Sequence, residues 1–187
     1  MKNYWLMKSE PEEVSVDDAL AAPDSTVPWT GVRNYQARNF MRDAMRVGDG
    51  VLFYHSSCAE PGIVGIARVA STAYPDPTQF DKKSPYYDPA SKREAPRWQL
   101  VDVQVLRKIA NITLPALRNR PALADMLVLK KGNRLSITPV EPRHWKAIVG
   151  IKPAEGSSIR STSPSPTTPG SPASQSPAPR RAARLTR

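Results

Sequence analysis

Residues 28–39 read Pro-Trp-Thr-Gly-Val-Arg-Asn-Tyr-Gln-Ala-Arg-Asn and hold the densest group of functional side chains in this sequence. An indole, a phenol, three side-chain amides and two guanidinium groups follow one another. Gly31 predicts a sharp turn of the backbone, because glycine adopts positive φ without a steric penalty. From Tyr35 onward the spacing is helical, with Tyr35 and Arg38 on one polar face, so we expect a helix from Tyr35 to about Arg46.

This group of side chains suits a planar ligand that forms hydrogen bonds, and a nucleobase is the obvious candidate. The Trp29 ring could stack on a base, the amides could read its edge, and the arginines could meet phosphates. The alternative is that Trp29 is a core residue, since large aromatic side chains dominate protein cores. Arg33 and Arg38 would then be solvated or paired with acids. The sequence leaves both interpretations open.

The hydrophobic pattern around this stretch predicts an α+β fold. Five segments carry the period or the apolar run of a strand, namely residues 4–7, 51–56, 62–70, 97–108 and 134–140. Short helices are expected at residues 15–22, 114–120, 122–129 and 141–150. Five or six strands with short helices between them predict a small, curled β-barrel.

The connection between residues 74 and 96 is rich in turn-forming residues and also contains aromatic side chains. A connection of this length inside a compact domain is usually functional or disordered. Its aromatic residues favour an ordered, functional segment.

Length and composition predict one domain followed by a tail. The chain has 187 residues, enough for one ordinary domain and an extension. Residues 153–187 contain seven prolines and few large apolar side chains. Such a segment cannot bury enough surface to offset its ordering entropy. We therefore expect a folded domain over residues 1–152 and a disordered tail over residues 153–187.

The charge favours a polyanionic partner. Lys and Arg number 27 against 17 Asp and Glu, which gives a formal net charge of +10. Five arginines against Glu155 give the tail +4, so both parts of the chain are basic. The arginines of the tail could add non-specific phosphate affinity, or the tail could be only a solvating extension.

Few residues suit metal or cofactor chemistry. Cys58 is the single cysteine, and His55 and His144 lie far apart without a ligand-like spacing, so we predict no metal and no cofactor. The first residues do not resemble a signal peptide, and no apolar run of 18 residues exists. We expect a soluble monomer without membrane contact in the cytoplasm, or in the nucleus of a eukaryotic cell.

The sequence lacks the common catalytic motifs. There is no Gly-x-Ser-x-Gly, no Walker sequence and no Gly-x-Gly-x-x-Gly. His55 and Cys58 would point to opposite faces at a strand end, so we predict that neither is catalytic. His55 and Ser56 could instead line the mouth of a pocket, or His55 could be satisfied by a backbone carbonyl. Lys8 and Ser9 end the first strand, where they could meet a phosphate and a base edge.

Several motifs resemble those of the EVE domain family. They occur in order from residue 2 to about residue 151, and the tail lies outside them. They are Lys8-Ser9-Glu10-Pro11, residues 29–39, Phe53-Tyr54-His55-Ser56, Val64-Gly65-Ile66-Ala67, Tyr74-Pro75-Asp76 and Leu135-Ser136-Ile137.

The resemblance implies a PUA-like barrel that reads modified bases in DNA or RNA, such as a methylated or hydroxymethylated cytosine, without transforming them. It makes Trp29 one wall of a base pocket, with Tyr87 and Trp98 as alternatives for the second wall. Two sets of residues complete the expected site. The pocket set adds Ser9, Asn34, Tyr35, His55 and Ser56, and the phosphate set is Lys8, Arg33 and Arg38.

Two other classes of function stay open. The same barrel could carry an enzyme for amide or nucleoside hydrolysis, as ASCH-like relatives of the family suggest, with Lys8, Glu10 and His55 as the groups near enough to act. It could also be a module that binds a small molecule or a peptide in its aromatic pocket. The basic charge favours nucleic acid over both.

Overall fold

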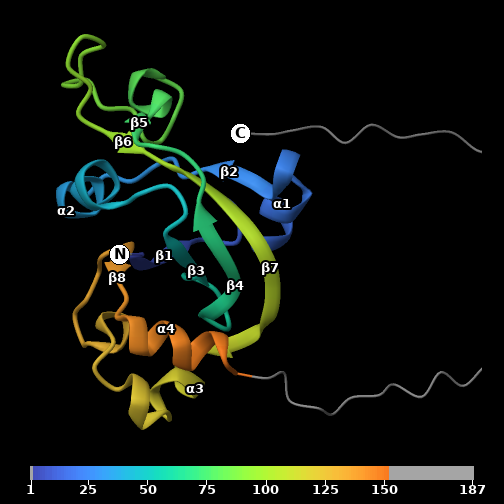
Figure 1. Cartoon of the computed structure of the whole chain (residues 1–187). Helices are drawn as coiled ribbons and strands as arrows, with labels where there is room; N and C mark the ends of the chain where they lie inside the picture. Colours follow the sequence, from blue (N-terminus) through green and yellow to red (C-terminus); the bar gives the residue numbers. More distant parts are fainter. Residues whose placement is uncertain (1, 152–187) are drawn as a thin grey trace, which may run out of the picture. The chain divides into compact units, whose positions relative to one another are not determined.

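The computed structural model describes residues 2–151, in which six strands form one mixed sheet in the order β2-β7-β4-β3-β1-β8 (Figure 1). The predicted tail of residues 153–187 lies outside the described residues. The strands are β1 (Tyr4–Ser9), β2 (Thr26–Pro28), β3 (Gly50–His55), β4 (Gly62–Val69), β7 (Asp102–Thr113) and β8 (Ile137–Pro139). A separate pair consists of β5 (Tyr74–Pro75) and β6 (Gln99–Leu100).

Short helices surround the sheet. The α-helices are α1 (Val16–Ala21), α2 (Tyr35–Asn39), α3 (Leu114–Arg118) and α4 (Pro142–Val149). The other helical turns are η1 (Pro23–Ser25), η2 (Phe40–Ala44), η3 (Pro77–Phe80), η4 (Pro121–Leu123) and η5 (Leu127–Leu129). In Figure 1, α3 and α4 lie at one end of the sheet, and β5 and β6 lie at the other.

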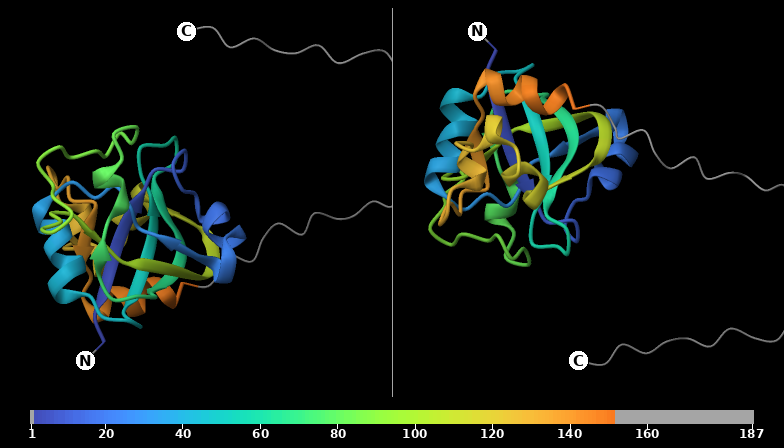
Figure 2. Two further views of the ribbon diagram at one scale, coloured as in Figure 1. Left: turned by 90° about the horizontal axis from the view of Figure 1, so that it is seen from above. Right: turned by 90° about the horizontal axis from the view of Figure 1, so that it is seen from below.

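The sheet is curled, as Figure 2 shows from two further sides. β1 and β3 pair in parallel, whereas the other pairs in this sheet are antiparallel. The pairing of β4 with the long strand β7 shifts register between Ile63 and Gly65 and again between Ile66 and Ala67. Irregularities of this kind bend and twist a strand. The α+β class and the curled, barrel-like sheet with short flanking helices are confirmed.

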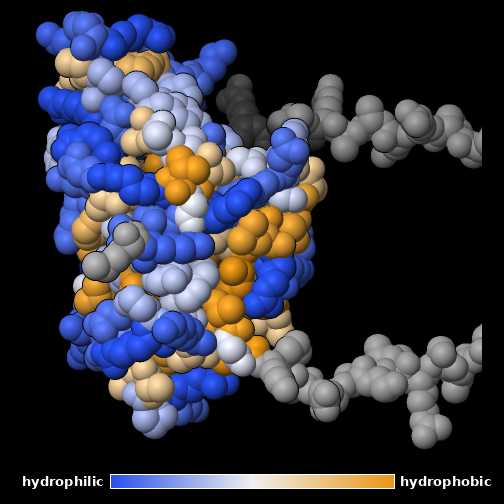
Figure 3. Space-filling model, in the orientation of Figure 1, coloured by the Kyte–Doolittle hydropathy of each residue, from blue (hydrophilic) through white to orange (hydrophobic). Residues whose placement is uncertain are grey.

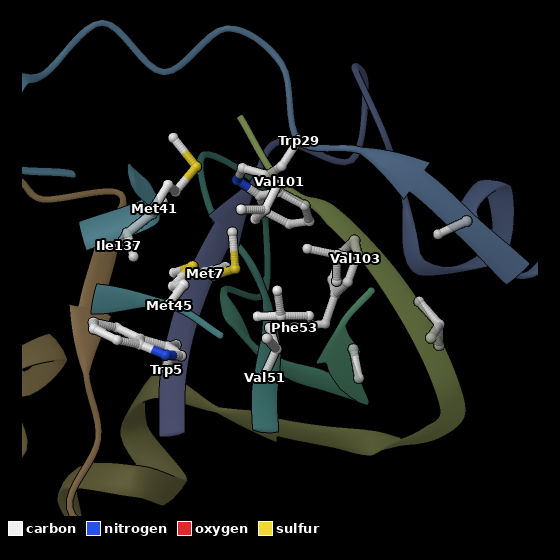
Figure 4. Close-up of a cluster of buried hydrophobic side chains, with 14 of the residues drawn as sticks. Trp5, Met7, Trp29, Met41, Met45, Val51, Phe53, Val101, Val103 and Ile137 are labelled. Carbon is white, nitrogen blue, oxygen red and sulfur yellow. The ribbon is translucent and has the colours of Figure 1, made fainter. Parts of the chain in front are cut away.

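Both faces of the central strands are buried, because successive side chains of a strand point to opposite faces. Val51 and Phe53 of β3 join one hydrophobic cluster with Trp5, Met7 and other residues, including Trp29 (Figure 4). The intervening residues of β3, Leu52 and Tyr54, join a second cluster beneath α3 and α4. The unbroken apolar run of β3 is explained by this double burial.

Several predicted elements differ from the structure. The helix expected at residues 122–129 is two separate 3-10 turns, η4 and η5, and the strand expected at residues 97–108 is divided between β6 and β7. The helix expected from Tyr35 to about Arg46 is α-helical only to Asn39 and continues as the π-helical turn η2, in which the Met45 N–H donates to the Phe40 carbonyl over 2.8 Å. Hydrophobic period does not separate these two helix types. The strand expected at residues 134–140 is shorter, because β8 pairs with β1 only over Ile137–Pro139.

The surface seen in Figure 3 is largely hydrophilic, with hydrophobic residues gathered over β4 and β7. Leu106 of β7 is among the exposed large hydrophobic residues. In the part of the chain described here, no helix has the length and apolar character needed to cross a membrane.

Candidate functional site

A cavity of about 690 Å³ lies where segments distant in the sequence meet. The end of β1 and the turn after it form one side. The longest continuous stretch of lining residues runs from β2 to Arg33. The lining residues are 8–10, 13–14, 27–33, 56–57, Tyr86, Arg134 and Ser136.

The structure brings five of the predicted site residues together in this cavity. They are Lys8, Ser9, Trp29, Arg33 and Ser56. The other six predicted residues are described by the structure but lie outside the lining. These are Asn34, Tyr35, Arg38, His55, Tyr87 and Trp98.

Trp29 belongs to the core and to the cavity at once. It is 6% exposed, and its ring meets Phe53 edge to face, with centroids 5.2 Å apart and planes at 79° (Figure 4). Its backbone N–H donates to the Val101 carbonyl over 3.0 Å, which fixes its position on the sheet. Trp29 thus lines the cavity while its indole is packed in the core.

Tyr86 is the second aromatic residue of the cavity. Its ring lies so close to Gly31 that a Cβ on this glycine would come within 2.7 Å of Tyr86 Cζ, and Gly31 has a φ of 81°. Both the close approach and the positive φ require glycine here. The Tyr86 hydroxyl donates to Glu13, and this hydrogen bond, together with burial and the charges of Glu13 and Glu10, raises the pKa of Tyr86 to about 12. The phenol therefore links the 74–98 segment to the turn after β1.

Arg33 also anchors the segment of residues 74–98, through hydrogen bonds from its guanidinium group. Its Nε and Nη2 groups both donate to the Tyr86 carbonyl, and Nη2 also donates to Thr78 Oγ1 over 2.8 Å. Nη1 donates to Asp76 Oδ2 over 2.8 Å and to the Val32 carbonyl over 3.0 Å. All five N–H donors of the guanidinium group are thus engaged within the protein. A phosphate would have to displace one of these acceptors.

Tyr35, Trp98 and Arg38 form a stack beside the cavity. Tyr35 and Trp98 are stacked with centroids 4.9 Å apart, and Arg38 Cζ lies 4.8 Å above the Tyr35 ring. Arg33 Cζ lies 5.4 Å from the other ring of the pair, that of Trp98. Trp98 is 6% exposed, and its indole N–H donates to Asp88 over 2.7 Å. The Trp98 ring is therefore covered by contacts within the protein, and it does not line the cavity.

Asn34 and His55 have structural partners. Asn34 is the N-cap of α2, and its side-chain oxygen accepts the Ala37 N–H over 3.0 Å. His55 Nε2 accepts the Val16 N–H at the start of α1, also over 3.0 Å. The partner of His55 is therefore a backbone N–H rather than the carbonyl considered from the sequence. Nε2 must stay unprotonated to accept this hydrogen bond. Burial lowers the pKa of His55, which favours the neutral imidazole that the contact requires.

Lys8 supplies a cation to the cavity. Its side chain is half-buried, and this burial lowers the pKa of the ammonium group. Among residues 2–151, no carboxylate lies within ion-pair distance of it. The neighbouring Ser9 hydroxyl donates to the Val14 carbonyl over 2.6 Å, so its oxygen is free to accept from a ligand.

Three potential metal ligands gather away from the cavity. Side-chain atoms of Asp125, Glu141 and His144 lie within 4.8 Å of one another. Arg143 forms ion pairs with both carboxylates, and His144 Nε2 lies 2.9 Å from Asp125 Oδ1. The carboxylate charges are therefore already compensated within the protein by Arg143. The sequence-based prediction that the chain binds no metal stays a prediction.

Sequence reasoning missed several residues of the cavity. Tyr86 stands next to Tyr87 in the sequence Ser84-Pro85-Tyr86-Tyr87-Asp88-Pro89, and a turn-rich segment has no period that says which tyrosine faces inward. Arg134 and Ser136 flank Leu135, which belongs to one of the motifs noted above. The only sequence feature that could have pointed to Arg134 and Ser136 is that they are polar residues directly before a short edge strand.

Known proteins share the sequence pattern and the fold of this chain. The EVE domain family model matches residues 3–151. Thymocyte nuclear protein 1 from Mus musculus is 42% identical over 175 residues, covering 84% of this chain and 76% of the mouse protein. The crystal structure of human THYN1 protein in complex with 5-methylcytosine-containing DNA has a TM-score of 0.76 at 42% identity, covering 81% of this chain and 100% of that one.

A bacterial structure is equally similar. A crystal structure of a protein from Pseudomonas putida has a TM-score of 0.74 at 46% identity, covering 78% of this chain and 97% of that chain. The family match extends over almost all residues that the structure describes, and the similarity holds in both sequence and fold. This chain therefore belongs to the EVE domain family.

Proposed function

We propose that this chain binds nucleic acid through a modified base, such as a methylated or hydroxymethylated cytosine, and does so without catalysis. The observation that carries the proposal is the cavity, which joins two aromatic rings with hydroxyl groups and a half-buried ammonium. The net charge of +10 and the 5-methylcytosine DNA bound to the human relative support it. A cytoplasmic or, in a eukaryotic cell, nuclear location is part of this proposal.

In this proposal the base leaves its stack and enters the cavity between Trp29 and Tyr86. Extracting a base from a duplex costs a few kcal/mol, and aromatic stacking contributes about 1–3 kcal/mol per base. A methyl group that reaches an apolar niche adds roughly 0.8 kcal/mol. Ser9 and Ser56 read the base edge, and Lys8 meets a phosphate. The discrimination by one methyl group is therefore modest.

The Tyr86→Ala variant tests the second wall, with Tyr87→Ala as the matched control. Tyr86 lines the cavity, whereas its neighbour Tyr87 is 36% exposed outside it. Both variants remove one phenol ring from the same segment. We expect Tyr86→Ala to weaken binding of an oligonucleotide with 5-methylcytosine roughly five- to hundredfold, because stacking worth about 1–3 kcal/mol is lost. Tyr87→Ala should bind like the wild type.

A fluorescence-anisotropy titration measures both affinities, and circular dichroism checks that each variant is folded. This pair is preferable to Trp29→Ala, since replacing a buried tryptophan costs about 3–5 kcal/mol of stability. An equal loss in both variants, or a loss in Tyr87→Ala alone, would refute the assignment of Tyr86 to the pocket.

One observation favours testing hydrolysis as a second function. Burial lowers the pKa of Lys8, and Glu10 and Glu13 line the same cavity, so a potential base and carboxylates are close together. The assay incubates the protein with acylated and unmodified nucleosides and follows products by mass spectrometry. We expect no turnover. Turnover that is abolished in Lys8→Met would instead establish an enzyme.

A further inference from the structure

The segment of residues 130–134, Lys-Lys-Gly-Asn-Arg, connects η5 to β8 at the edge of the cavity. The side chains of Lys130, Lys131 and Arg134 are all exposed. Arg134 also lines the cavity, as does Ser136 two residues later. Three exposed cations are therefore held within five residues of chain that leads directly into the candidate site.

The backbone of this segment is fixed independently of its cations. The Asn133 N–H donates to the Lys130 carbonyl over 3.2 Å, and Asn133 Nδ2 donates to the Leu127 carbonyl over 2.7 Å. Asn133 Oδ1 accepts the Leu135 N–H over 3.0 Å. Gly132 has a φ of 81° and open space where a Cβ would stand. One asparagine holds the turn, so the basic side chains are free to meet a partner.

The cations of this segment differ from some cations of the domain in their pairing, and from other unpaired ones, such as Arg118 and Arg120, in leading into the cavity lining. Arg33, Lys108 and Arg143 each form an ion pair with a carboxylate at 2.8 Å or less. Within residues 2–151, Lys130, Lys131 and Arg134 have no carboxylate within 4.0 Å. Their positive charge is not neutralised inside the domain.

Lys8 is a second cation, besides Arg134, in the cavity lining next to this segment. The backbone N–H of Lys8 donates to the Ser136 carbonyl over 2.8 Å, which places the end of β1 beside the residues that follow the basic segment. Lys8 has no ion-pair partner in the described part of the chain either. Unpaired positive charge thus continues from the exposed segment into the half-buried cavity.

We propose that residues 130–134 bind the phosphate backbone of the nucleic acid that flanks the base in the cavity, an inference that rests on the proposed function. Phosphates next to an inserted base have to pass the rim of the cavity, where Arg134 belongs to the lining and Lys130 and Lys131 precede it in the same exposed turn. Contacts between lysine or arginine and phosphate supply sequence-independent affinity and fix the register of a strand. The segment positions the strand, and the cavity reads the base.

The test is the Lys130→Ala/Lys131→Ala double variant, which leaves the cavity lining intact. Its matched control is Arg118→Ala/Arg120→Ala, which removes the same charge from exposed positions outside the cavity lining. Binding of duplexes with and without 5-methylcytosine is titrated at several salt concentrations. Each lost phosphate contact reduces the slope of log K against log salt by about 0.9.

We expect the lysine double variant to lower the affinity for both duplexes by the same factor and to reduce the salt slope by nearly two. The control variant should keep the wild-type slope. Equal slopes in the two double variants would overturn the inference, since only net charge would then matter. A wild type without preference for the modified duplex would contradict the proposed function instead, so the two failures are distinguishable.

Discussion

Arg33 stands in a stretch that resembles a binding motif, but its contacts in the structure stabilise the fold. Its donors hold Asp76 and the Tyr86 carbonyl, and the Asp76 carboxylate is 1% exposed at the ion pair. The Gly31 N–H donates to the same carboxylate oxygen over 3.0 Å. Through these contacts the Trp29 stretch fixes the segment that carries Tyr86. A guanidinium group beside amides and an indole looks the same in sequence for either role.

We predict that Arg33→Ala destabilises the protein by roughly 3 kcal/mol, because it leaves a buried carboxylate without its cation. The remaining hydrogen bonds from Gly31 and Thr78 to Asp76 place the effect at the lower end of the range for such pairs. Urea denaturation measures the change, and the control is Arg38→Ala, which removes a partly buried arginine that forms no ion pair with a carboxylate within residues 2–151. A loss below about 1 kcal/mol in Arg33→Ala would show that the pair is not structural.

The same ion pair predicts an acid dependence of stability. Burial raises the pKa of Asp76, but hydrogen bonds from Arg33, Thr78 and Gly31 outweigh it and hold the pKa below its usual range. The stabilisation is therefore present above the pKa of unfolded aspartate, about 3.9, and is lost as the pH falls through the lower folded value. Asp76→Asn should be less stable at pH 7. Chemical denaturation should find this deficit reduced at pH 3; a constant deficit would contradict it.

At the scale of elements, the sequence predicted what local patterns determine. Alternation and apolar runs identified the principal strands of the sheet, and the residues Ser15 to Asp18 form the capping box expected from their spacing. The parallel pairing of β1 with β3 depends on contacts between distant segments, so no local period predicts it. That pairing sets Ser9 opposite His55 and brings the ends of both strands to one edge of the sheet.

The contact between β3 and α1 predicts a pH dependence near neutrality. Burial lowers the pKa of His55; the charge of Asp17 opposes this shift and the charge of Lys108 adds to it. As the pH falls, the imidazole is therefore protonated at a higher pH in the unfolded chain than in the folded one. The contribution of His55 to stability is thus complete above about pH 6.5 and is lost as the pH falls. His55→Ala should be destabilised at pH 7, with a smaller difference from the wild type at pH 5. Urea denaturation at both values checks this; an unchanged difference would contradict it.

At the scale of the whole molecule, the cavity is assembled from segments that are far apart in the sequence. Lys8, Trp29 and Ser56 were predicted because each stands at a strand end or in a dense motif. Tyr86 and Arg134 were not, because their direction depends on how a long connection and a short edge strand pack. The physical chemistry of single segments therefore predicted some of the residues that line the cavity, and tertiary packing determines the others.

The residues beyond the domain give a prediction that depends on their charge and on their small number of large apolar groups. Deleting residues 153–187 removes a charge of +4 from a chain of +10. We expect the melting temperature to change by about one or two degrees, since few large apolar groups are removed, and non-specific affinity for DNA to fall. Calorimetry and a titration with unmodified DNA measure the two effects. A large drop in melting temperature would show that the tail contributes to the fold.

Recognition of a modified base inside the cavity is tested most directly by one ratio of dissociation constants. The wild-type protein is titrated with two duplexes of identical sequence, one of which carries a single 5-methylcytosine, at several salt concentrations. Both constants should rise with salt because phosphate contacts are common to both duplexes. Their ratio should stay constant at roughly four- to tenfold in favour of the methylated duplex, since the buried methyl group contributes about 0.8 kcal/mol or somewhat more. A ratio of one at every salt concentration would contradict base reading by this domain.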